Sequence, residues 1–293
     1  MHKYLRAVGF SKIKSRKDIQ KLIVESVKCA DKKACTTIDD DVLYMEYRAS
    51  YGDHIGLCIR GEYDESGKFI YDYMIPCLDG KGITTCEDIT VERHIEKLSY
   101  AGIVDDYKIG VSIIFYLQNI IPYLKCNNNG NLPLHGTSLT LSALSTKGTI
   151  LFPIEKNEIE RNNAIKYNMR KSRMIAEARN GNEQAIENLT LQDIDVNTVV
   201  HKKALEEDVY SLVDTYFMPY GVECDLYAIL GEITDVQKVQ NVYTKENVYI
   251  MTLDVNDIIF DIAINEEDLV GEPQAGRRFK GIIWLQGFIN FPD

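Results

Sequence analysis

The chain has 293 residues, of which 45% are hydrophobic and 26% are charged, and its formal net charge is −11. This length exceeds what one core usually organises, so two or three domains are expected. No run approaches the roughly 18 apolar residues of a membrane span, and the first residues lack a basic-then-apolar leader, so a soluble cytoplasmic protein is expected.

Charge is unevenly distributed along the sequence. Residues 1–38 carry ten Lys and Arg against three Asp and Glu, whereas residues 222–293 carry five against thirteen. Such asymmetry often marks an interaction surface, although the two ends could equally complement each other within the fold. The seven cysteines are scattered and form no C-x-x-C pair. They are therefore expected to be reduced thiols, and no cofactor is expected.

The N-terminal half combines a helix with strands. A helix is predicted over residues 15–28, with Ser15 as its cap and an apolar stripe at helical spacing. Runs rich in Tyr, Ile and Val predict an antiparallel meander over residues 42–49, 54–63 and 69–77. Two further strand-like runs cover residues 108–124 and 138–153. Residues 1–153 are therefore assigned to one α+β domain with an antiparallel sheet.

The composition changes after residue 154. Strong helix formers predict helices over residues 155–179, 183–189 and 198–218, which together make a helical bridge over residues 154–221.

The C-terminal segment, residues 222–293, predicts a small acidic β-barrel of OB-like character. Its alternating strands cover residues 226–240, 248–255, 258–264 and 277–291, and Asn256-Asp257 is a hairpin turn. Glycines within the last strand indicate sharp bends at barrel corners.

A weak metal-site candidate consists of Glu92, His94 and Glu96. These residues alternate, so on a strand they would share one face and could hold a divalent cation. A second histidine at ligand spacing is missing, and the exposed face of an ordinary sheet has the same pattern. No metal is therefore expected, and a helix at this position would separate the three side chains.

Catalytic motifs are absent, including the nucleophile elbow, the phosphate-binding loops and the zinc-binding H-E-x-x-H. An active site dispersed along the chain stays possible, because catalytic groups need only meet in space. Such a site, or that of a small-ligand receptor, would lie where the N-terminal sheet meets the helical bridge. Its weak candidates for ligand binding are His54 and Arg60, together with Glu92 and His94.

The first functional hypothesis is a non-enzymatic protein-binding or scaffolding module with another protein as its partner. The charge asymmetry, the barrel and the missing catalytic motifs favour it. An enzyme or small-ligand receptor is the alternative. Nucleic-acid binding is disfavoured, because the barrel that carries possible stacking aromatics is acidic and would repel phosphates. The sequence does not determine the oligomeric state.

Three stretches resemble a family of unknown function found in anaerobic Gram-positive bacteria: Met1–Phe10, Tyr210–Cys224 and Gly271–Gly287. The resemblance extends over about the full length of the chain. It implies a bacterial cytoplasmic protein and carries no activity and no functional residues.

Overall fold

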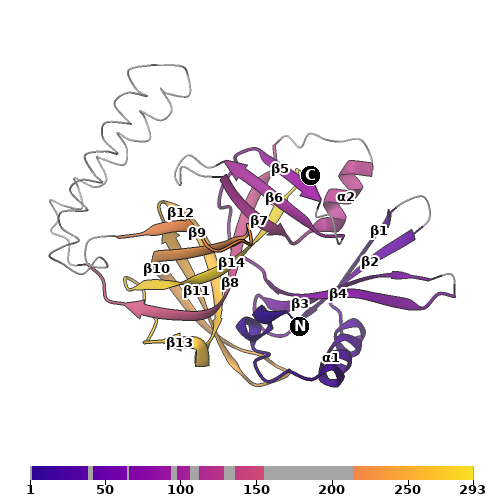
Figure 1. Cartoon of the computed structure of the whole chain (residues 1–293), viewed down its shortest axis with the longest axis horizontal. Helices are drawn as coiled ribbons and strands as arrows, with labels where there is room; N and C mark the ends of the chain where they lie inside the picture. The colour runs from indigo at the N-terminus through magenta and orange to yellow at the C-terminus, as the bar shows by residue number, and fades with distance from the viewer. Residues whose placement is uncertain are drawn as a thin grey trace, which may run out of the picture.

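A computed structural model describes residues 2–38, 42–64, 66–93, 98–105, 112–128, 136–154 and 214–292. Strands dominate these residues, and they form a closed barrel with a four-stranded sheet beside it (Figure 1). The three predicted helices of the bridge lie largely in residues 155–213, outside the described residues. Among the described helices, none has the length and apolar character that a membrane crossing requires.

The N-terminal segment contains a short 3-10 helix and the predicted α-helix. The 3-10 helix η1 (Lys3–Val8) ends at Gly9, whose φ of 86° lies in the left-handed region that glycine adopts without strain. Helix α1 (Arg16–Lys28) is capped by Ser15, whose hydroxyl oxygen accepts a hydrogen bond from the Asp18 backbone amide at 3.1 Å. The predicted helix and its cap are therefore confirmed.

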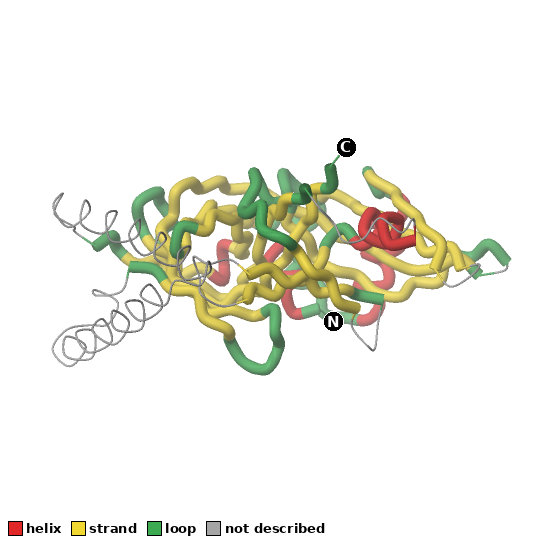
Figure 2. The backbone as a smooth tube through the Cα atoms, turned by 90° about the horizontal axis from the view of Figure 1, so that it is seen from above, coloured by secondary structure: helices red, strands yellow, loops and turns green. Residues whose placement is uncertain are grey.

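The predicted meander is confirmed, with one strand added at its edge. Its four antiparallel strands lie in the order β1-β2-β3-β4: β1 (Lys32–Ile38), β2 (Val42–Ser50), β3 (Ile55–Tyr63) and β4 (Phe69–Leu78). The outer ends of these strands project away from the barrel, as Figures 1 and 2 show.

The barrel is closed by five strands: β8 (Ser138–Leu151), β10 (Leu226–Gln240), β11 (Asn247–Val255), β12 (Ile258–Asn265) and β14 (Arg278–Asn290). Around the barrel they follow the order β10-β11-β12-β8-β14, and β14 pairs again with β10. Only the pair of β12 and β8 is parallel within this ring. One of the five strands, β8, belongs to the segment 1–153. The barrel therefore extends beyond the segment 222–293, from which the sequence predicted it.

Glycine and turn residues shape the barrel as the sequence indicated. The pairing of β14 with β8 shifts register after Gly281, where an added Cβ would lie 2.6 Å from the Phe279 ring. Asn256 and Asp257 have φ angles of 54° and 63°, which is the backbone that a two-residue hairpin turn requires.

A three-stranded extension continues the barrel sheet from β14. Its strands are β7 (Ser112–Leu117), β6 (Tyr100–Asp105) and β5 (Ile89–Arg93). After β7 the chain turns into helix α2 (Ile120–Asn128). The predicted continuous strand over residues 108–124 is therefore wrong beyond Leu117. An apolar run alone does not distinguish a buried strand from a buried helix.

Three short elements complete the described chain: β9 (Tyr216–Pro219), the 3-10 helix η3 (Glu266–Asp268) and β13 (Leu269–Val270). Strand β9 pairs with β10. The end of the predicted helix over residues 198–218 is thus wrong at Tyr216–Met218, where pairing with a barrel edge outweighs helical periodicity.

Two apolar cores stabilise this arrangement. The first fills the barrel and continues beneath β5–β7 and α2. The second lies between the outer wall of the barrel and the N-terminal elements, where Val248, Ile250 and Ala263 pack with η1, α1 and the meander. The N-terminal segment therefore covers the outer face of β11 and β12.

The basic N-terminus docks on the acidic barrel. Lys3 Nζ lies 3.5 Å from Glu223 Oε2, and Arg6 forms an ion pair with Asp268. The Ser11 backbone amide donates to Glu246 Oε2 at 3.1 Å. Basic side chains of the N-terminal segment are therefore paired with acidic side chains of the C-terminal segment within the fold.

Candidate functional site

A buried charge network joins the meander to the barrel. Arg60 on β3 is fully buried, and its Nε donates to Glu46 Oε2 at 2.7 Å. Its Nη1 donates to the hydroxyl oxygens of Tyr73 and Tyr116 at 3.0 and 2.9 Å, and its Nη2 donates to the Gln118 carbonyl oxygen. Every nitrogen of this guanidinium is engaged, so Arg60 holds two sheets together and faces no open site.

Arg48 completes this network from β2. Its Nε donates to Glu46 Oε1 at 2.9 Å, and its Nη2 donates to the Gln118 carbonyl oxygen at 2.9 Å. Burial raises the pKa of Glu46, but Arg60 and Arg48 outweigh this effect and hold the pKa below its usual value. The carboxylate therefore stays charged between two arginines.

The Gln118 side chain ties the same junction to three strands. Its Nε2 donates to the Leu78 carbonyl oxygen at 3.0 Å, to Gln286 Oε1 at 2.8 Å and to Ser142 Oγ at 3.2 Å. These partners belong to β4, β14 and β8, so one buried amide fixes the meander against the barrel.

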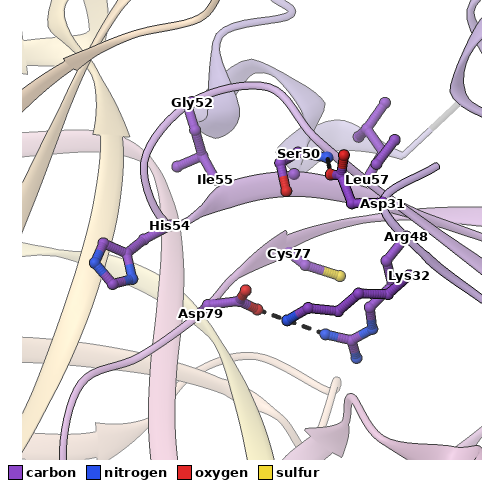
Figure 3. Close-up of a pocket in the computed structure, with 12 residues that line it drawn as sticks. Asp31, Lys32, Arg48, Ser50, Gly52, His54, Ile55, Leu57, Cys77 and Asp79 are labelled. Atoms are coloured by element: carbon purple, nitrogen blue, oxygen red, sulfur yellow. Dashed lines mark hydrogen bonds and ion pairs between the residues drawn. The ribbon is translucent and has the colours of Figure 1, made fainter. Parts of the chain in front are cut away.

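A small polar cavity lies in front of this network (Figure 3). Arg48, Lys32 and Asp79 converge at one end of it, and the Cys77 sulfur points toward them. Arg48 Nη1 lies 3.5 Å from Asp79 Oδ1. His54 lies beyond Asp79, and its φ of 61° places it in the left-handed region, where it helps close the turn between β2 and β3.

Two neighbouring thiols are buried here, and one of them, Cys77, lines the cavity. Hydrogen bonding from Cys58 and the positive charge of Arg48 lower the pKa of the Cys77 thiol despite its burial, whereas burial raises the pKa of Cys58. Cys77 lies opposite Gly56, where an added Cβ would lie 2.7 Å from the Ala49 carbonyl oxygen. Glycine therefore lets β2 approach closely and leaves the cavity open above Cys77.

The size of this cavity limits its chemistry. Its volume is about 50 Å³, whereas a water molecule takes up about 30 Å³ of liquid. It is large enough for water or a small ion, and it has no room for an organic substrate. His54 borders the cavity, whereas Arg60 does not line it and lies buried in the charge network.

The predicted metal-site residues are only partly described. Glu92 lies exposed on β5, which ends at Arg93, while His94 and Glu96 fall outside the described residues. No group of three His, Cys, Asp or Glu side chains that could hold a metal gathers in the described part of the chain.

Aromatic and apolar side chains cluster at the outer end of the meander, and only some of them are exposed. We call this cluster the distal face, and its side chains come from three neighbouring strands: Leu43, Met45, Tyr47, Tyr63, Phe69 and Tyr71. Leu43 and Tyr71 are each 41% exposed, whereas Tyr47 is buried and the other three side chains are half-buried. Val42 and Ile70 lie at the same end on the opposite side of the sheet, and they are 38% and 45% exposed.

The aromatic rings of the distal face are fixed by mutual contacts. The Tyr47 and Tyr63 hydroxyl groups are 2.6 Å apart, and the Phe69 ring centroid lies 5.2 Å from that of Tyr47. Burial and the hydrogen bond with Tyr63 raise the pKa of Tyr47 to about 12. The rings therefore form an ordered, neutral surface.

A β-bulge assigns two tyrosines of β4 to opposite faces. Arg60 pairs with Tyr73 and Gly61 pairs with Tyr71, so Asp72 is the extra residue between them. Tyr73 consequently turns inward to Arg60, and Tyr71 turns outward to the distal face.

Sequence reasoning did not identify Glu46, Arg48 or Gln118. A signal was available, because Glu46 and Arg48 alternate within an otherwise apolar strand and would share one face. What could not be read from the sequence is that Arg60 lies opposite Glu46, since that depends on the register of β2 and β3.

Comparisons with known proteins identify a family. No curated protein and no solved structure matches the chain. Residues 5–287 match the family described as "Domain of unknown function, E. rectale Gene description (DUF3881)". The match covers nearly the whole chain and confirms the resemblance to a family of unknown function. The chain therefore belongs to the DUF3881 family.

Proposed function

We propose that this chain is a non-enzymatic protein-binding module whose contact surface is the distal face. The observation that carries the proposal is the set of exposed apolar and aromatic side chains at the end of the sheet that projects away from the barrel. Exposed apolar side chains that gather at one end of a molecule are typical of interaction sites. Tyrosine rings offer a large contact area at a low cost in side-chain entropy.

The strand arrangement supports an extended segment of the partner as the bound element. Strand β4 is an edge of its sheet. At the barrel end of this edge, Gln286 bonds the backbone at Pro76 and Leu78. Toward Phe69 no described strand pairs with this edge. An added strand there would place alternate side chains beside Tyr71.

The barrel is a weaker candidate for the contact surface. Its ring of five strands with one parallel pair supports the predicted OB-like character, and OB barrels bind their ligands on one face and the adjoining loops. Here the N-terminal segment covers the outer face of β11 and β12. The acidic surface and this cover both disfavour nucleic acid as the partner.

A reducing compartment fits the state of the thiols. All seven cysteines are free in the structure, and disulfides are rare in the cytosol. We therefore retain a cytoplasmic location as part of the proposal.

The proposal is tested by capture from host lysate with the tagged full chain and its Leu43→Ser/Tyr71→Ser variant. Both substituted side chains are partly exposed, so the fold should persist, and melting curves verify this. Loss of two apolar contacts should reduce the retained companion at least tenfold, since about 1.4 kcal/mol corresponds to a factor of ten in affinity.

The matched control is Met218→Ser/Val222→Ser, which removes two exposed apolar side chains on the barrel side of the molecule. It should retain the companion in full. Equal retention by the distal-face variant and the wild type, or no companion at all, would overturn the proposal. Loss of a homodimer in the distal-face variant would show instead that the occupant is a second copy of the chain.

A further inference from the structure

Two buried cysteines are neighbours on one face of the meander. In the register of β3 and β4, Cys58 pairs with Ile75 and Gly56 pairs with Cys77. The two cysteines are therefore diagonal neighbours whose side chains project from the same face of the sheet. The Cys58 thiol acts as a hydrogen-bond donor toward the Cys77 sulfur. The fold thus places two thiols together that lie on different strands.

The small polar cavity gives one of these thiols a route to solvent. Cys77 lines this cavity and is 4% exposed, whereas Cys58 does not line it and has no exposure. The Cys77 sulfur points toward Lys32 and Asp79, two exposed residues of the lining (Figure 3). A cavity of about 50 Å³ excludes bulky reagents, but hydrogen peroxide is only one heavy atom larger than water.

Positive charge lies beside the thiol that the cavity reaches. Arg48 pairs with Cys58 across β2 and β3, so it lies on the same face, and it lines the cavity with Cys77. The hydrogen bond from Cys58 and the charge of Arg48 lower the pKa of Cys77, and burial raises the pKa of Cys58. Because the thiolate is the nucleophilic form, Cys77 is the thiol that attacks and Cys58 is the one that keeps its proton.

We propose that Cys77 is a site of oxidation by hydrogen peroxide, and that Cys58 then closes a disulfide between β3 and β4. The Cys77 sulfur attacks one peroxide oxygen, the O–O bond breaks, and the departing hydroxide takes up the proton that the thiol lost. This leaves water and a sulfenic acid. The Cys58 sulfur then displaces the sulfenic oxygen, which leaves as water with the proton of Cys58. Two thiols and one peroxide thus give one disulfide and two water molecules.

The resulting bridge should be easy to reduce. Diagonal neighbours of an antiparallel pair lie about 7 to 8 Å apart at Cα, at the limit of about 7 Å that a disulfide spans, so β4 must shift toward β3. Strand β4 is the edge of its sheet, and Gly56 presents no side chain opposite Cys77. A strained disulfide is reduced more readily than a relaxed one, so the oxidation is reversible. This site is independent of the distal face.

The experiment exposes the reduced full chain to hydrogen peroxide and follows each cysteine by peptide mass mapping. We expect a bridge between Cys58 and Cys77 that forms about tenfold faster than the exposed Cys35 is oxidised, and that a thiol reductant reverses. With tert-butyl hydroperoxide, which the cavity is too small to admit, Cys35 should be oxidised first. These measurements need no substitution, so they do not depend on the folding of a variant.

Two variants separate the steps, and melting curves verify that each is folded. In Cys58→Ala the sulfenic acid of Cys77 should accumulate and be trapped by dimedone, because no thiol resolves it. The matched control Cys35→Ala should form the bridge as the wild type does. The inference is overturned if Cys58 and Cys77 stay reduced while Cys35 is oxidised, or if both peroxides form the bridge equally fast. A sulfenic acid that persists at Cys77 in the wild type would also overturn it.

Discussion

Glu46 accepts hydrogen bonds from two arginines, one on each carboxylate oxygen. Burial of this network costs desolvation free energy for each arginine, and the same carboxylate offsets the cost for both. Removal of that carboxylate leaves two cations in a junction where Arg60 has no exposure. The side chain therefore matters far more to stability than a surface ion pair would.

The substitution Glu46→Gln tests this at the residue scale. It keeps the size of the side chain and removes its charge, and it should lower the free energy of unfolding by about 3 to 5 kcal/mol. Urea denaturation at pH 7 measures the change. The control is Asp79→Asn, since Asp79 is 52% exposed and 3.5 Å from Arg48, and its loss should cost less than about 1 kcal/mol.

The acid limb of the stability profile gives a second readout of the same change. Because the folded protein lowers the pKa of Glu46, the stabilisation is complete above the unfolded pKa of about 4.3 and is lost as the pH falls through the folded pKa. The Glu46→Gln variant should lack this part of the acid destabilisation. Equal losses for Glu46→Gln and Asp79→Asn at pH 7 would show that the network is not the source of stability.

At the scale of elements, the bulge in β4 connects stability with the distal face. Gly61 stands opposite Tyr71 at the bulge. An added Cβ at Gly61 would lie 2.1 Å from the Ile70 carbonyl oxygen and 2.8 Å from the Phe69 ring. The close approach of the two strands, rather than a special φ angle, is what requires glycine here.

The substitution Gly61→Ala should therefore be costly. We expect a loss of about 3 kcal/mol in the free energy of unfolding, because the contact is with backbone that cannot move aside without breaking the strand pair. Thermal and urea denaturation measure it. Gly67→Ala, in the turn before β4, meets no atom within 4 Å and has a φ of 75°, so it should cost only about 1 to 2 kcal/mol. Similar losses for both variants would contradict the role assigned to the bulge.

Elements with strong local patterns were predictable. Helix α1 has its cap and stripe, and the hairpin of β11 and β12 has a two-residue turn, so both followed from nearby residues alone. Strand β1 was missed because its Lys32 and Lys33 resemble an exposed loop, although lysine on an edge strand also protects against aggregation. The helix α2 was missed because Ile120–Leu124 continues the apolar run of β7. The residue at which β7 ends and α2 begins is decided by tertiary packing and not by the local sequence.

The whole molecule depends on a contact that no local pattern reveals, namely the insertion of β8 into the barrel. This strand pairs with β14 along nearly its full length and with β12 in parallel. Parallel pairing joins residues about 120 apart in sequence, such as Ser142 and Asp261, and only the closed ring makes it favourable. The distal face was equally hidden, because it requires the register of three strands.

The division of the chain at residues 153 and 221 stays a prediction, and the fate of an isolated fragment tests it. A fragment of residues 222–293 lacks β8, so β12 and β14 would each lose a partner and the barrel core would open to water. We expect no cooperative unfolding transition from this fragment and a solvent-exposed emission spectrum for Trp284.

In the full chain, far-UV circular dichroism and Trp284 fluorescence should report one coincident transition, because β8 contributes Leu144 to the outer core and Leu141 to the inner one. A cooperative transition with protected Trp284 in the fragment would establish residues 222–293 as an independent domain. Strand β8 would then be an addition to a barrel that folds without it.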